Sequence, residues 1–230
     1  MSTCGILLSC EHGGYEVPPA YLYLFAGRPE ALYSHRGWDP GTLLLGQYLA
    51  EALSLPLVFS TTTRLLIELN RSLENDQLFS EFGITLTRQE KEVLILQYYM
   101  PYREALQREI ELYHQAGKSC AHFSLHSFTP IWYGRERLVD IGLLFDPERS
   151  LENDLCQQLM KRLQRLLPDM RVRFNEPYLG TDDGLTTFLR TRYDDTAYAG
   201  IEIEINQKWV ESSEMKRIHK ALKDALGRLI

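Results

Sequence analysis

Short apolar runs alternate along this chain with longer segments in which apolar residues recur at helical spacing. The apolar runs predict strands at 4–10, 56–60, 64–69, 120–127, 138–145, 171–175 and 200–206. Helical spacing predicts helices at 41–53, 152–167, 183–190 and at the C-terminal end. The longest helical pattern, 87–116, is opened by a Thr87–Glu90 capping box, interrupted at Pro101 and followed by Gly117, which predicts two helices.

This alternation predicts a three-layer α/β/α sandwich around a mostly parallel or mixed central sheet. The chain has 230 residues, and 44% of them are hydrophobic, enough to bury one good core. No repeat, low-complexity tract or linker interrupts the sequence. We therefore expect a single domain spanning 1–230.

Charge and hydropathy narrow the class of partner. The formal net charge of −6 argues against nucleic acid, because a phosphate-binding surface is basic. No apolar run approaches the roughly 20 residues needed to cross a bilayer, and the N-terminus lacks a secretory signal, so we expect a cytoplasmic protein without a membrane partner. The four cysteines form no CxxC pair and are expected to be buried reduced thiols. A small-molecule substrate is the expected partner, and a homo-oligomer is left open.

Two histidines stand at the ends of predicted strands: His12 in SCEHGG and His126 in FSLHS. Two imidazoles, one carboxylate and an open position make a catalytic zinc site. We favour Asp39 as the carboxylate because its irregular loop before a helix leaves it free to turn toward a neighbouring strand end. Glu11 and Glu16 stay as alternatives, and hydrogen bonds within loops explain either histidine when it is considered alone.

The last predicted strand has isoleucines on one face and Glu202, Glu204 and Asn206 on the other. This pattern has two interpretations. The structural one is an edge strand whose polar face is solvated. The functional interpretation makes Glu204, nearest the C-terminal end, a general base that activates water, with Glu202 as its partner or as an alternative base.

Asn70 and Arg71 follow the predicted strand 64–69. The guanidinium of Arg71 suits a substrate carboxylate, and the Asn70 amide adds a donor. Arg64, at the start of the same segment, is a further candidate or a structural residue. Tyr102, in an aromatic-rich segment, is a candidate to line the pocket. The simpler alternatives are a surface ion pair for Arg71 and a core position for Tyr102.

Seven segments follow one another along the chain as SCEHGGYEVP (9–18), HRGWDPG (35–41), RLLIELNRS (64–72), YYMPYR (98–103), LHSFTP (125–130), DIGLLFDP (140–147) and GIEIEINQ (200–207). In these segments the chain resembles the N-formylglutamate amidohydrolase family, a relative of zinc carboxypeptidases and aspartoacylases. The resemblance implies a phosphorylase/hydrolase-like α/β fold. It further implies zinc as the cofactor, with His12 and His126 as ligands, and Glu204 as the catalytic carboxylate.

The resemblance also implies that Asn70 and Arg71 hold the substrate carboxylate. Two positions depart from the expected patterns. Tyr15 stands three residues after the first histidine, where metallocarboxypeptidases have a metal-binding glutamate. Glu68 replaces the aspartate that usually precedes Leu-Asn-Arg. The third metal ligand therefore depends on Asp39 rather than on the resemblance.

Together these observations predict a zinc-dependent amidohydrolase that cleaves an N-formyl or other N-acyl amide of a small acidic amino acid. One alternative keeps the metal but makes the protein a metallocarboxypeptidase or a deacylase of another substrate. A second alternative is a non-catalytic family member that binds a small acidic ligand. The acyl group, the amine and the native metal are left open by the sequence.

Overall fold

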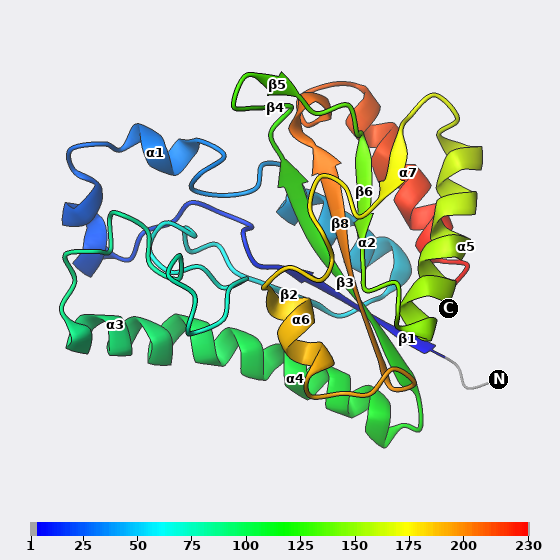
Figure 1. The fold of residues 1–230 in the computed structure, drawn as a ribbon, viewed down its shortest axis with the longest axis horizontal. Coiled ribbons are helices and arrows are strands. Elements are labelled where there is room, and N and C mark those ends of the chain that lie inside the picture. The colour runs from blue at the N-terminus through cyan, green and yellow to red at the C-terminus, as the bar shows by residue number, and fades with distance from the viewer. Residues whose placement is uncertain (1–3, 230) are drawn as a thin grey trace.

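A six-stranded mixed sheet forms the centre of the computed structural model, which describes residues 4–229 (Figure 1). The strand order is β2-β1-β3-β8-β6-β7. Four neighbouring strands run parallel: β2 (Leu57–Phe59), β1 (Cys4–Cys10), β3 (Ser119–Phe128) and β8 (Tyr198–Asn206). The remaining two run antiparallel to these, namely β6 (Ile141–Leu144) and β7 (Val172–Phe174). The predicted sheet type is confirmed.

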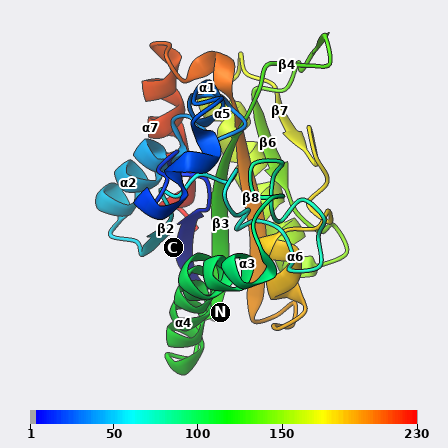
Figure 2. The ribbon, with the colours of Figure 1, turned by 90° about the vertical axis from the view of Figure 1, so that its left-hand side faces the viewer.

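Helices cover both faces of the sheet (Figure 2). On one face, α2 (Thr42–Leu53) and α5 (Ser150–Leu166) pack against the sheet, and α7 (Glu214–Leu226) packs against both of these helices. The other face packs against α4 (Met100–Gln115) and α6 (Leu185–Arg190). The isoleucines of β8 point into the first of these two cores, as their alternation predicts. The predicted three-layer sandwich is confirmed.

The connections beyond the carboxyl ends of β1, β3 and β8 carry the short elements of the fold. They are η1 (Pro19–Phe25), α1 (Glu30–Tyr33), the hairpin of β4 (Ile131–Trp132) and β5 (Arg135–Glu136), and η3 (Gln207–Trp209). In open α/β sheets ligands bind outside the carboxyl ends of the strands. The predicted site residues His12 and His126 therefore lie at the edge of the sheet where folds of this kind bind ligands.

The long helical segment is less interrupted than its sequence suggests. The Thr87–Glu90 capping box is present at the start of α3 (Arg88–Leu94). A π-helical turn, η2 (Ile95–Tyr99), then joins α3 to α4. Pro101 lies in the first turn of α4, directly after this π-helical turn. The predicted interruption at Pro101 is therefore a change of helix type, and Figure 1 shows one continuous rod.

The predicted strand at 64–69 is wrong, because this segment is a buried irregular turn. Its backbone bonds are local or reach a neighbouring loop: Leu66 N donates to Thr63 O (3.0 Å) and Glu68 N to Leu78 O (2.9 Å). Its apolar side chains fill the core that also contains α4. An apolar run of this length looks alike in a strand and in a buried coil, so packing decided its conformation.

Two further expectations concern the thiols and the helices. All four cysteines are free; Cys10, Cys120 and Cys156 are buried and Cys4 is half-buried. Within residues 4–229, every helix is too short or too polar to cross a membrane.

A buried polar chain runs through the sheet around His122 of β3. The Tyr198 hydroxyl lies 2.8 Å from His122 Nδ1, and His122 Nε2 lies 2.7 Å from the Ser9 hydroxyl. Ser9 donates in turn to Glu11 Oε1 (2.7 Å). These bonds all run in one direction if His122 is neutral with its proton on Nε2. Burial lowers the pKa of His122 to about 4, which favours that neutral form.

The core placement of β8 predicts the effect of truncating Ile203, which is 0% exposed. Ile203→Ala should lower the free energy of unfolding by about 2–5 kcal/mol, because it leaves a cavity under α5. Urea unfolding followed by circular dichroism measures this loss. Leu44→Ala is the control, since Leu44 is 69% exposed. Equal losses in both variants would contradict the assigned core.

The neutral His122 predicts a loss of stability in acid. Because its pKa is lower in the folded protein than in the unfolded chain, the unfolded chain binds more protons between about pH 6.5 and 4. The stability of the wild type relative to His122→Gln should therefore be full above this range and should fall by about 2 kcal/mol at pH 5. Urea titrations of both proteins at pH 7 and pH 5 test this. Parallel pH dependence of the two proteins would refute the neutral assignment.

Candidate active site

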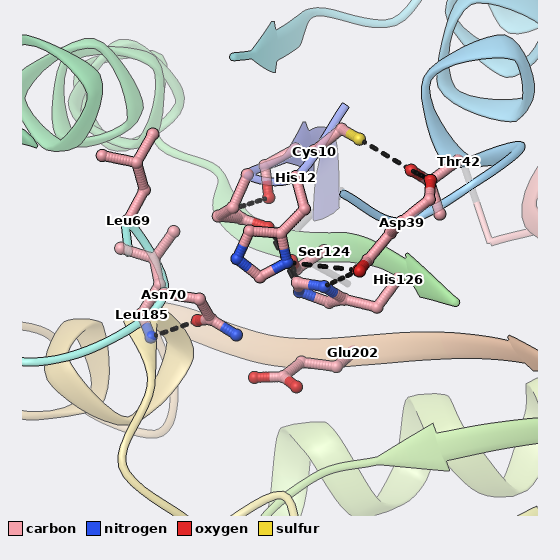
Figure 3. A network of polar contacts seen from close by, with 12 residues as sticks. Cys10, His12, Asp39, Thr42, Leu69, Asn70, Ser124, His126, Leu185 and Glu202 are labelled. Carbon is pink, nitrogen blue, oxygen red and sulfur yellow. Dashed lines mark hydrogen bonds and ion pairs between the residues drawn. The ribbon is translucent and has the colours of Figure 1, made fainter. Parts of the chain in front are cut away.

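Three residues from distant parts of the chain meet at the carboxyl ends of β1 and β3. His12 follows β1, His126 belongs to β3, and Asp39 lies in the loop before α2. Asp39 Oδ2 lies 3.2 Å from His12 Nδ1 and 3.0 Å from His126 Nδ1. Figure 3 shows both rings turned toward this oxygen. All three residues are buried, and one ligand atom from each lies within 4.8 Å of the others.

This donor set fits a divalent cation such as zinc. Neighbouring ligand atoms of a tetrahedral zinc ion lie about 3.3 Å apart, close to the separations around Asp39 Oδ2. The second nitrogen of each ring faces a carboxylate: His12 Nε2 contacts Glu68, and His126 Nε2 lies 3.2 Å from Glu11 Oε2. Such carboxylates keep the proton on the outer nitrogen and direct the lone pair of the inner nitrogen toward the metal position.

The other two carboxylates considered from the sequence lie elsewhere. Glu11 is fully buried behind His126, where the Ser124 hydroxyl donates to it (2.6 Å). Glu16 is exposed and accepts a hydrogen bond from the Thr61 hydroxyl (2.6 Å). Asp39 is thus the carboxylate that the fold brings to both rings.

Glu68 is a site residue that the sequence analysis did not assign. It contacts His12, and Arg64 pairs with it through Nη2 (2.6 Å). Arg64 Nη1 also lies 3.2 Å from Asp39 Oδ1. The four-residue spacing of Arg64 and Glu68 was the available signal for their ion pair.

Proton affinities in the cluster reflect its balance of charge. Burial would raise the pKa of Asp39, but His12, His126 and Arg64 lower it below its usual value. Burial would lower the pKa of His126, but hydrogen bonds with Asp39 and Glu11 raise it well above its usual value. The imidazole protons therefore balance buried carboxylates. A divalent cation provides the same balance when it replaces those protons.

Glu204 and Glu202 lie on β8, directly opposite β3. The register places Glu204 beside His126 and Glu202 beside Ser124. Because β8 runs between β3 and β6, the edge-strand interpretation is wrong. Glu204 is 6% exposed, and its Oε2 has no hydrogen-bond partner among residues 4–229. Burial raises its pKa to about 8, and the charges of Asp39 and Glu202 act in the same direction.

An unpartnered buried carboxylate oxygen requires an explanation, and a bound ion or ligand supplies one. Glu202 differs, because its Oε1 accepts a hydrogen bond from the Thr186 hydroxyl (2.9 Å). Of the two glutamates, Glu204 therefore has the freer oxygen beside the two rings.

Asn70 and Arg71 lie on the other side of His12. Asn70 N donates to Glu68 Oε1 (3.0 Å), and Asn70 Oδ1 accepts from Leu185 N (2.7 Å), as Figure 3 shows. Arg71 Nη1 donates to the carbonyl oxygen of Asp183 (2.8 Å). These bonds hold both side chains at the site.

The aromatic segment 98–103 supports the site from behind. The hydroxyl of Tyr99 and Nη2 of Arg103 both donate to the carbonyl oxygen of Arg71 (2.8 Å each). Tyr102 is 6% exposed, and its hydroxyl donates to Glu11 Oε1 (2.9 Å). The expected pocket position of Tyr102 is corrected, since it packs in the core and reaches the site only through Glu11.

One cavity of about 770 Å³ contains the cluster and both flanking regions. His12, Asp39, His126 and Glu204 line it together with Arg64, Asn70 and Arg71. Its far end is lined by aromatic side chains, among them Phe128, Trp132 and Tyr178. These aromatic residues are not among the site residues predicted from the sequence.

Comparisons with known proteins show the family and the fold of this chain. The family model described as N-formylglutamate amidohydrolase matches residues 4–210. The crystal structure of gene product Atu2144 from Agrobacterium tumefaciens is similar, with a TM-score of 0.82 and 26% identity over 99% of this chain and 92% of that chain. N-formylglutamate amidohydrolase from Ralstonia eutropha JMP134 has a similar fold, with a TM-score of 0.70 and 19% identity over 100% of this chain and 92% of that one. No curated protein sequence matches significantly. The match over most of its length shows that this chain belongs to the N-formylglutamate amidohydrolase family, a family of hydrolases that act on amides.

Proposed function

We propose that this protein is a zinc-dependent amidohydrolase that cleaves an N-formyl or other N-acyl amide of a small acidic amino acid. The observation that carries the proposal is the convergence of His12, Asp39 and His126 within 4.8 Å in a ligand-sized cavity. Membership of the amidohydrolase family supports amide hydrolysis. The name of the Ralstonia eutropha protein supports an acidic amino acid as the amine part of the substrate.

His12, Asp39 and His126 would hold the zinc ion. When bound, zinc supplies a Lewis acid that polarises the amide carbonyl and makes water a stronger nucleophile. Glu68 and Glu11 hold the two imidazoles in orientation through their outer nitrogens.

Glu204 acts as the general base of the reaction. Its free Oε2 accepts a proton from the attacking water and returns it to the nitrogen that leaves. Burial raises its pKa above that of an ordinary carboxyl, which makes Glu204 a stronger base for the proton of the attacking water. Glu202 stays hydrogen-bonded to Thr186 and contributes negative charge beside Glu204.

Arg71 and Asn70 orient the substrate by its carboxylate. A guanidinium forms strong charge-assisted hydrogen bonds with a carboxylate, and the Asn70 amide adds a donor beside it. Arg64 contributes positive charge on the same side, although its ion pairs with Asp39 and Glu68 give it a mainly structural role. Fixing the carboxylate places the scissile carbonyl next to His126 and Glu204.

The metal assignment predicts the composition of the purified protein. The wild type should contain about one zinc ion per chain, and a His12→Ala, His126→Ala double variant close to none, because two of three protein ligands are lost. Elemental analysis by mass spectrometry measures the content. His219→Ala, on α7, is the control and should keep its zinc. Equal zinc contents in the wild type and the double variant would refute the assignment.

The role of Glu204 predicts a separate loss of turnover. Glu204→Gln should lower kcat by about 10²–10⁴-fold while the zinc content stays unchanged, because the amide cannot accept the proton. Release of glutamate from N-formyl-L-glutamate and N-acetyl-L-glutamate measures the rate. Glu16→Gln, an exposed carboxyl outside the cavity, is the matched control. Full turnover by Glu204→Gln would remove this residue from the mechanism.

A further inference from the structure

The cavity extends well beyond the metal position, toward a group of aromatic side chains. We propose that the amide hydrolysed here carries a bulky apolar acyl group with an aromatic ring, rather than a formyl group. This inference rests on the proposed function, which places the substrate carboxylate at Arg71 and the scissile carbonyl between His126 and Glu204. It adds the chemical class of the acyl group.

The register of β3 and β8 orders the parts of the site along one line. Ser124 pairs with Glu202, His126 with Glu204, and Phe128 with Asn206. Successive pairs are two residues apart, which is about 7 Å along a strand. The site can therefore be described in three consecutive steps along the strands, one step for each pair in this order.

The carboxylate-binding side belongs to the first step. The side-chain oxygens of Asn70 and Glu202 approach one another across Gly184, whose ideal Cβ position is 3.2 Å from the first and 3.4 Å from the second. Figure 3 shows these two side chains side by side. The metal position belongs to the second step, and the aromatic end begins at the third.

The direction of the amide bond determines which part of the substrate reaches the aromatic end. In an N-acyl amino acid, the nitrogen and the carboxylate lie on one side of the carbonyl carbon, and the acyl chain lies on the other. If Arg71 holds the carboxylate and the carbonyl lies at His126, the acyl chain points toward Phe128. A formyl group has only hydrogen on that side and leaves the aromatic end uncovered.

The aromatic end is held in place rather than formed by loose side chains. Arg137 stacks on three rings, with its guanidinium carbon 5.7 Å from the centroid of Phe128, 5.0 Å from that of Trp132 and 5.0 Å from that of Tyr178. It also donates a hydrogen bond to the Tyr178 hydroxyl (3.0 Å). These contacts fix Trp132 and Tyr178 before a substrate arrives, which lowers the ordering cost of binding.

The hairpin of β4 and β5 lies beyond the end of β3 (Figure 1). Trp132 and Tyr133, at its tip, are 45% and 90% exposed, yet both line the cavity. Large exposed rings at the rim of a ligand cavity are typical of a binding surface for an apolar group. The cavity volume of about 770 Å³ is also in the range that holds drug-sized ligands, whereas N-formylglutamate is much smaller.

The test compares two substrates that differ only in the acyl group, using the zinc-loaded full chain. We expect kcat/KM for N-phenylacetyl-L-glutamate to exceed that for N-formyl-L-glutamate by at least about tenfold, measured as glutamate released. Trp132→Ala should lower this selectivity ratio by about tenfold, and Trp132→Phe should keep most of it. Tyr23→Ala is the control, because Tyr23 is 60% exposed on η1 and outside the cavity lining; rates and ratio should be unchanged.

Preference for the formyl compound, or a ratio that Trp132→Ala does not change, overturns the inference and leaves the proposed function intact. If neither compound is hydrolysed, the proposed function fails and calorimetric binding of the same two compounds decides the inference. Tighter binding of the phenylacetyl compound that Trp132→Ala weakens supports the aromatic acyl site. Equal affinities, or no binding of either compound, overturn it.

Discussion

The arrangement of the site depends on one carboxylate oxygen shared by two imidazoles. Asp39 Oδ2 lies within hydrogen-bond distance of His12 and of His126, and all three side chains are buried. Buried charge is costly unless it is balanced on every side. The surroundings provide that balance, since Glu68 and Glu11 lie behind the rings and Arg64 reaches both Asp39 and Glu68.

Glu68 links His12, a proposed metal ligand, to Asn70, a proposed substrate-binding residue. It contacts His12 through one oxygen, and the same oxygen accepts the backbone N–H of Asn70. A movement of the turn that carries Asn70 would therefore disturb the orientation of His12. Helix α4 stabilises both regions, because Tyr102 forms a hydrogen bond with Glu11 and Arg103 forms one with the carbonyl oxygen of Arg71. The aromatic segment thus supports the site without lining it.

Most of the fold was predictable from local pattern, and the failures have a common cause. The alternation of Ile201, Ile203 and Ile205 with polar residues identified β8 and its two faces, but not its central place in the sheet. The apolar segment 64–69 was read as a strand because its pattern cannot distinguish a strand from a buried coil. Glu68 went unassigned for the same reason, since its contact with His12 exists only in that coil.

By itself the sequence determined the alternating elements, the strand-end positions of His12 and His126, and the family to which the chain belongs. These features depend on local spacing and on short motifs, and both can be recognised from residues that are close together in the sequence. Tertiary structure alone decided that Asp39 rather than Glu11 or Glu16 faces both rings, and that Phe128 and Trp132 extend the cavity. Such choices depend on how segments far apart in the chain pack against one another, and local pattern carries no information about that packing.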